Sequence, residues 1–175
     1  MPMIVKLVGS VLVVLACTAM GFSLVRREQE RYRSIEELCL FLMELARLIR
    51  FSLEPLPSLL AHLAEDENAP ARPFAEKLKE LLDEKKSQPF RVLWQEAAEA
   101  YVTTYHLPAA VKSLFNTLGS RLGQADSDIE ADRLARGAEE IRQLLEAMKK
   151  DSAQKEKNTK TLGALLGVLI VIMLL

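Results

Sequence analysis

Side chains that could carry chemistry are few in this chain and stand far apart. The two histidines, His62 and His106, are separated by 44 positions, and neither lies in the ligand spacing of a known metal site. We expect His62 on a helix surface and His106 in a turn before Pro108. The chain contains no P-loop, GxGxxG or GxSxG element. The sequence therefore predicts no catalytic residue, no cofactor and no metal site, which disfavours an enzyme.

The carboxylates and cysteines have structural explanations too. Glu96 and Glu99 are interleaved with basic residues, so we expect them on a solvated helix face rather than as a general acid and base. Cys39 falls on a helical stretch and Cys17 in the first apolar run. Both are expected to be small buried hydrophobes. A lipoprotein site at Cys17 is disfavoured because apolar residues continue to Val25.

Charge is confined to the middle of the chain. The 175 residues include 23 Lys and Arg against 24 Asp and Glu, and half of all residues are apolar. Residues 1–25 carry a single charge, at Lys6, and residues 161–175 carry none. This pattern excludes a simple cytosolic globule. The even charge balance also disfavours a nucleic-acid binder, which normally has a basic face.

The N-terminal apolar run has the length of a membrane span. Residues 7–25 contain 19 consecutive residues without a charge, about what crosses a bilayer as a helix. A cleaved signal peptide is the alternative. It is disfavoured because four arginines follow between positions 26 and 33, and positive clusters are retained on the cytoplasmic side. We expect residues 1–25 to be an uncleaved transmembrane anchor that leads into the cytoplasm.

The C-terminal run is shorter. Residues 162–175 have no polar side chain and would cover roughly 21 Å of a core about 30 Å thick. Lys160 can snorkel from the interface, and lysines from Lys149 onward place the preceding side in the cytoplasm. We therefore expect a second transmembrane segment at 161–175 and a cytoplasmic helical domain at 26–160.

The middle of the chain shows helical periodicity and no long alternation of period two, so it predicts an all-α helical bundle of about six helices. The first apolar stripe consists of Ile35, Leu38, Leu42, Leu45, Leu48 and Ile49. Ser34 and Glu37 form a predicted capping box at its start. Proline- and glycine-rich breaks separate further helices at 58–66, 74–86, 90–105 and 108–122.

A long final helix is predicted from Asp126 or Ser127, with Ser127 and Glu130 as a second capping box. It is expected to continue into the membrane, and Asn158 and Thr159 are the favoured place for a break. Gly119 and Gly123 suit helix C-termini, where a left-handed residue is common.

Some large apolar side chains are expected in the core, and others could form a contact surface. Trp94 is flanked by apolar residues at helical spacing and is expected in the core. Leu40, Phe41 and Met43 all lie near the main stripe. Any of them that faces outward would mark a contact surface, and the sequence alone does not sort them.

Several short motifs follow one another over essentially the whole chain. They are Leu7-Val8-Gly9-Ser10 with Gly21-Phe22, Ile49-Arg50-Phe51-Ser52-Leu53-Glu54-Pro55-Leu56, Trp94-Gln95-Glu96-Ala97, Leu118-Gly119 with Leu122-Gly123 and Asp126, and Thr161-Leu162-Gly163-Ala164-Leu165-Leu166-Gly167. In this order the motifs resemble the stage III sporulation protein AB family. The family commonly has a glutamine a few residues after the position of Asp126, where this chain has Glu130.

The resemblance implies a non-enzymatic membrane protein of endospore-forming bacteria. Its soluble domain would be similar to the helical domain of the type II secretion F platform protein. It would sit in the mother-cell membrane that faces the forespore, within a channel complex needed for endospore formation. Its implied partners are the cytoplasmic ATPase stage III sporulation protein AA, other membrane components of that complex and the lipid bilayer. Self-association is left open.

A different class of function also fits the order of segments. If residues 1–25 were removed as a signal peptide, the helical domain would be an extracytoplasmic adaptor held only by the C-terminal segment. An intact N-terminus in the mature membrane protein would exclude this alternative.

Overall fold

Six α-helices make up the part of the chain that the structure describes, and no strand occurs there. The structure is a computed structural model that describes the backbone of residues 2–174 and the side chains of residues 26–154, positions 53 and 86 excepted. The helices are α1 (Pro2–Phe51), α2 (Leu56–Glu65), α3 (Arg72–Glu84), α4 (Phe90–Thr104), α5 (Ala109–Gly119) and α6 (Ser127–Leu174). The predicted all-α bundle of about six helices is confirmed.

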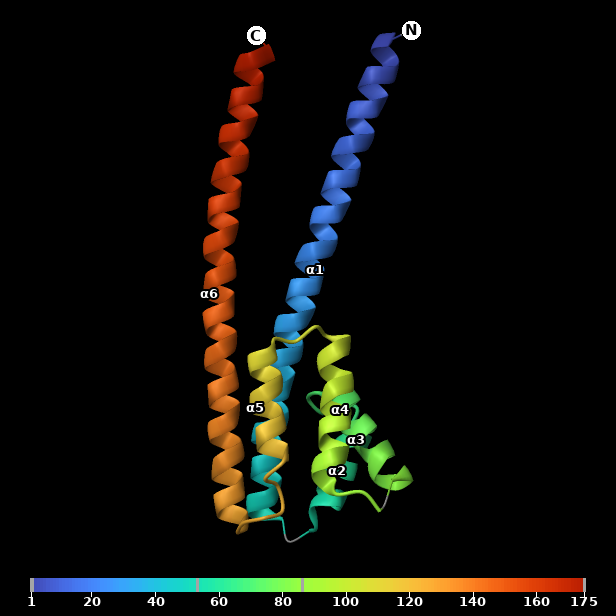
Figure 1. Cartoon of the computed structure of the whole chain (residues 1–175), viewed down its shortest axis with the longest axis vertical. Helices are drawn as coiled ribbons and strands as arrows, with labels where there is room; N and C mark the ends of the chain where they lie inside the picture. Colours follow the sequence, from blue (N-terminus) through green and yellow to red (C-terminus); the bar gives the residue numbers. More distant parts are fainter. Residues whose placement is uncertain (1, 53, 86, 175) are drawn as a thin grey trace.

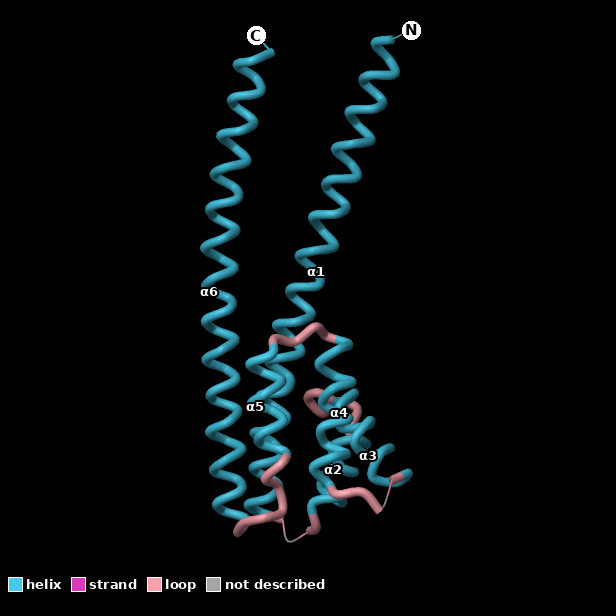
Figure 2. The backbone as a smooth tube through the Cα atoms, viewed as in Figure 1, coloured by secondary structure: helices cyan, strands magenta, loops and turns pink. Residues whose placement is uncertain are grey.

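Two long antiparallel helices form the frame of the molecule. Figure 1 shows α1 and α6 running side by side through the bundle and then extending beyond it, so that both chain ends lie at the same end of the molecule. The four short helices pack beside the inner halves of α1 and α6, as the tube in Figure 2 shows. Each helix contacts the next one along the chain, and α6 returns to α1.

Polar contacts join α1 to α6 at both ends of the bundle. At the end far from the termini, Arg50 of α1 forms ion pairs with Asp128, at 3.6 Å, and with Asp132. At the other end the hydroxyls of Tyr32 and Ser152 lie 2.6 Å apart. These contacts fix the register of the two helices.

The core is built around four buried aromatic rings, one from each of α1, α3, α4 and α5. Phe41, Phe74, Trp94 and Phe115 are all fully buried. The ring centroid of Phe74 lies 4.9 Å from those of both Trp94 and Phe115. The indole Nε1 of Trp94 donates a hydrogen bond to the carbonyl oxygen of Phe115 at 3.2 Å, which satisfies its polar atom inside the core. The prediction that Trp94 belongs to the core is confirmed.

The first predicted capping box is wrong. Ser34 lies in the middle of α1, where its Oγ donates to the carbonyl oxygen of Glu30 at 2.9 Å. A serine can bond back to the preceding turn in this way without ending a helix. No proline or glycine separates residue 26 from Ser34, so the helix that starts at Pro2 continues without interruption to Phe51.

The second predicted capping box gives the correct start of the helix, but the side-chain hydrogen bonds of Glu130 differ from those predicted. Helix α6 begins at Ser127. The buried carboxylate of Glu130 accepts hydrogen bonds from the backbone N–H groups of Gln124, at 2.7 Å, and Ala125, at 3.1 Å. Glu130 therefore accepts hydrogen bonds from the α5–α6 loop, which it holds in place, rather than from the backbone N–H of Ser127. The predicted continuation of the final helix is confirmed, because α6 extends to Leu174 with no break at Asn158 and Thr159.

The two glycines after α5 have different roles. Gly123 has φ +78°, the left-handed conformation predicted for it. Gly119 does not have a positive φ, so that prediction is wrong for Gly119. It is the last residue of α5, three positions earlier than the predicted end, and a Cβ there would lie 2.1 Å from the Nε1 of Trp94. Gly119 thus makes room for the indole ring.

The predicted transmembrane segments, 7–25 and 162–175, lie outside the residues whose side chains are described. Across the described part of the chain, none of the helices offers a stretch that is both long and apolar enough to pass through a bilayer. The two segments belong to the continuous backbone helices α1 and α6.

Replacing Gly119 with alanine is expected to destabilise the bundle. The new methyl group would press on Trp94, and overpacking a core costs about 1–3 kcal/mol. The free energy of unfolding, followed through the fluorescence of the only tryptophan, measures the effect. Ser113→Ala, at an exposed position of the same helix, is the control and should change little. Equal stability of Gly119→Ala and wild type would contradict the packing described here.

Candidate functional site

The side chains considered for chemistry lie apart on the surface or are buried alone. His62 is exposed, with its Nε2 3.1 Å from Glu54. His106 occupies a turn with φ +52°. Glu96 and Glu99 form ion pairs with Lys85 and Lys112 on the surface. Within the described residues no group of three or more His, Cys, Asp or Glu side chains is placed to hold a metal ion.

Cys39 is a buried structural residue, as predicted. It is a free cysteine on the face of α1 that meets α6. Burial, reinforced by the neighbouring Glu36, raises the pKa of its thiol to about 11. A thiol with such a pKa is a poor nucleophile at neutral pH. Cys17 lies outside the described side chains.

The outer face of α1 carries large apolar side chains with no partner helix. Leu40 is 54 % exposed and Met43 is 56 % exposed, whereas Phe41 between them is fully buried. In a helix, residues three or four positions apart share a face. Leu40 and Met43 are therefore neighbours on the side of α1 turned away from the core, and Phe41 shares the buried side with Leu38 and Leu45.

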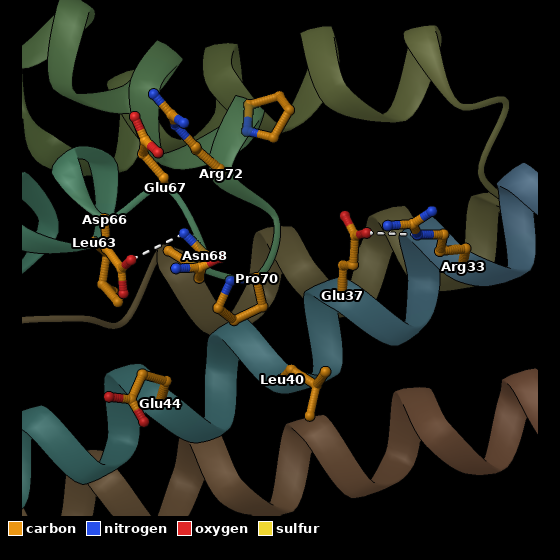
Figure 3. Close-up of a pocket in the computed structure, with 12 residues that line it drawn as sticks. Arg33, Glu37, Leu40, Glu44, Leu63, Asp66, Glu67, Asn68, Pro70 and Arg72 are labelled. Carbon is orange, nitrogen blue, oxygen red and sulfur yellow. Dashed lines mark hydrogen bonds and ion pairs between the residues drawn. The ribbon is translucent and has the colours of Figure 1, made fainter.

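An open groove of about 700 Å³ lies along this face, between α1 and the loop that joins α2 to α3. Figure 3 shows Leu40, Glu37 and Glu44 on the α1 side of the groove and Asp66, Glu67 and Pro70 on the loop side. Both sides contribute apolar side chains: Leu40 from α1, and opposite it Leu63 at the end of α2, Pro70 in the loop and Pro73 at the start of α3. We call this feature the α1 groove.

The rim of the α1 groove carries more acidic than basic side chains. Four carboxylates line it, those of Glu37, Glu44, Asp66 and Glu67, against the guanidinium groups of Arg33 and Arg72. Both arginines are already paired with carboxylates: Arg33 with Glu37 at 3.1 Å and Arg72 with Glu76 at 2.8 Å.

Two of the carboxylates are held by local contacts. Arg47 hydrogen-bonds to Glu44 and lowers the pKa of that carboxyl group, so Glu44 stays ionised. Asp66 accepts the backbone N–H of Asn68 at 2.9 Å, which shapes the loop. The buried Ala71 then turns the chain into α3 with φ +48°. The groove is thus an apolar strip with a fixed, net negative rim, which suits docking of a partner rather than catalysis.

The sequence pointed to one side of this groove only. It identified Leu40, Phe41 and Met43 as candidates without showing which of them are buried and which face outward. The spacing of Phe41, three residues after Leu38 and four before Leu45, was the signal that would have placed it in the core. The loop side was missed, because nothing local shows that residues 66–73 approach α1.

The described residues form an all-α bundle that is framed by two long helices and has a groove along one of them. Comparison with known proteins then gives the family. The model of the family described as stage III sporulation protein AB matches residues 6–175, and the chain belongs to that family. Stage III sporulation protein AB of Bacillus subtilis (strain 168) is 25% identical over 170 residues, which cover 97% of this chain and 99% of that protein. No solved structure matches.

Membership in this family confirms the resemblance drawn from the short motifs. It also assigns the chain a role in sporulation. The family match extends through both predicted membrane segments and the whole helical bundle, so the bundle and its flanking helices belong to one family unit.

Truncating Leu40 of the α1 groove, or the exposed Met43 next to it, should leave stability almost unchanged. Leu40→Ala and Met43→Ala are expected to change the free energy of unfolding by less than about 0.5 kcal/mol, as surface substitutions usually do. Phe41→Ala removes a buried ring and should cost about 3–5 kcal/mol. Chemical denaturation of the three variants provides the measurement. A large loss for Leu40→Ala would mean that this face is already covered within the chain.

Proposed function

We propose that the chain is a membrane platform component of the mother-cell-to-forespore channel complex of endospore-forming bacteria, and that it couples a cytoplasmic ATPase to the membrane apparatus. Family membership supports the role in sporulation. The single observation that supports a docking role is the α1 groove, where Leu40 is exposed between acidic side chains and the exposed Met43 lies next to it on the outer face of α1. The platform acts by contact, with no cofactor, metal, nucleic acid or catalytic residue of its own.

The continuity of α1 supplies the mechanical argument for coupling. The same unbroken helix carries the exposed Leu40 and the apolar segment 7–25. Fifteen residues separate Val25 from Leu40, so the two lie about 22 Å apart along the helix axis. A partner that tilts or displaces the groove would move the apolar segment as a rigid extension of it.

The membrane arrangement is part of this proposal. Residues 1–25 and 161–175 cross the mother-cell membrane that surrounds the forespore, and residues 26–160 lie in the mother-cell cytoplasm. The basic residues next to both apolar segments support this orientation. Both α1 and α6 extend beyond the bundle at the same end, which is compatible with this orientation (Figure 1). The partners are the ATPase stage III sporulation protein AA and the other membrane components of the complex.

The orientation is tested by cysteine accessibility in intact non-sporulating cells that express the protein, where the far side of the membrane is open to the added reagent. Cys17 and Cys39 are first replaced by serine, and single cysteines are then placed at Ser87, an exposed loop residue, and after Leu175. An impermeant maleimide should label the second position and spare the first until the cells are permeabilised. Labelling at Ser87 in intact cells would instead support an extracytoplasmic adaptor held by the C-terminal segment after signal cleavage, and the coupling proposal would be wrong.

The docking surface is tested by binding of the purified ATPase to the full-length protein in nanodiscs. Leu40→Ser together with Met43→Ser removes two apolar side chains, each contributing about 1.5–3 kcal/mol when fully buried in a contact. The dissociation constant should rise by at least about tenfold. Val92→Ser, at an exposed apolar residue of α4, is the matched control and should bind as wild type. Unchanged affinity of the double variant would remove the α1 groove from the proposal.

A further inference from the structure

A second groove lies between the end of α5 and the start of α6. It has a volume of about 240 Å³, and its apolar side is formed by Leu114 and Leu118. The two helices approach closely here because α6 has a glycine at position 137. A Cβ on Gly137 would lie 2.4 Å from the Cδ1 of Leu118. The close approach brings charged side chains of α6 next to those of the α5–α6 loop.

Three arginines line this groove: Arg121 from the loop, and Arg133 and Arg136 from α6. Backbone carbonyls hold two of them in place. Arg133 donates through Nη1 to the carbonyl oxygen of Arg121 at 3.4 Å, and Arg136 donates through Nε to that of Asp132 at 3.3 Å. These contacts leave further N–H donors on each guanidinium. We call the feature the arginine groove.

The three arginines lack carboxylate partners, which is unusual in this domain. Among the described residues from 34 to 154, the arginines outside any ion pair are these three and Arg91 of α4. The nearby acids are engaged elsewhere, since Asp132 pairs with Arg50 and Glu139 with Arg142. One carboxylate, that of Glu140, lines the groove itself.

We propose that the arginine groove binds a carboxylate-rich segment of a protein partner. Guanidinium groups bind carboxylates with paired, parallel hydrogen bonds, and three of them face one Glu140 carboxylate. The apolar floor at Leu114 and Leu118 would accept a side chain from the same segment. The groove is distinct from the α1 groove, whose rim has the opposite charge balance. The protein thus presents two docking surfaces that select different partners or different parts of one partner.

A protein segment fits better than the other sources of negative charge. Arg136 precedes Lys160 by 24 residues, which is about 36 Å along α6. The groove therefore lies toward the end of the molecule far from both termini (Figure 1). Under the proposed topology, on which this step rests, lipid headgroups are out of reach. The chain as a whole carries a net charge of −1, without the extended basic face that nucleic-acid binding requires.

The test uses the full-length protein in nanodiscs of phosphatidylcholine, with a fluorescein-labelled hexaglutamate peptide as probe and fluorescence anisotropy as readout. Replacing Arg121, Arg133 and Arg136 together with alanine should weaken binding by at least about tenfold. Arg91→Ala removes an equally unpaired arginine from another helix and should bind as wild type. Glu140→Gln removes the one opposing carboxylate and should tighten binding about twofold, an effect that damage to the fold would not produce.

Equal binding by wild type and the triple variant would overturn the proposal, as would an equal loss in Arg91→Ala. Displacement of the peptide by inorganic phosphate at an equal concentration of charge would indicate a free-anion site instead. Stronger binding of an oligonucleotide, or of phosphatidylglycerol included in the nanodisc, would also contradict docking of a protein segment. Because the probe binds independently of the ATPase, failure here leaves the proposed platform role intact, and failure of ATPase docking leaves the arginine groove intact.

Discussion

The antiparallel packing of α1 on α6 is the constraint on which the other features of the structure depend. It buries one side of α1, including Leu38 and Leu45, and it is fixed near one end of the bundle by Arg50 and near the other by Tyr32. The four short helices then complete the ring on the remaining inner side. Because the inner faces of α1 pack against α6 and the core, only its outer face is exposed to a partner.

A polar cluster sets where the two long helices leave the bundle. The hydroxyl oxygens of Tyr32 and Ser152 lie within hydrogen-bonding distance of the carboxylate of Glu28, at 2.7 and 2.5 Å, and of each other, while Lys149 forms an ion pair with Glu36 at 3.2 Å. Beyond this cluster α1 and α6 diverge (Figure 1). The cluster thus lies between the helical domain and the two apolar segments, and the proposed coupling would pass through it.

Much of the fold was predictable because it depends on local signals. Proline is tolerated in the first turn of a helix but disrupts the interior, so the breaks near Pro55, Pro89 and Pro108 were correctly placed. The wrong predictions concern residues that are compatible with two different positions or roles in a helix. Ser34 matches a helix start but also tolerates a helix interior, and Gly119 matches a helix end although the ring of Trp94 is what requires its missing side chain. The loop side of the α1 groove could not be predicted from the sequence, because a contact between distant segments leaves no local sequence pattern.

The α1 groove, which we propose as a docking surface, is acidic and partly apolar and lies on the helix that leads to the N-terminal apolar segment. Hydrogen–deuterium exchange of the full-length protein in nanodiscs, with and without the cytoplasmic ATPase, tests this most directly. The account predicts that bound ATPase slows exchange in residues 36–47 of α1 and in the α2–α3 loop at 66–71, where the groove lies. Protection confined to α4, or no protection in either groove segment when the ATPase is bound, would contradict it.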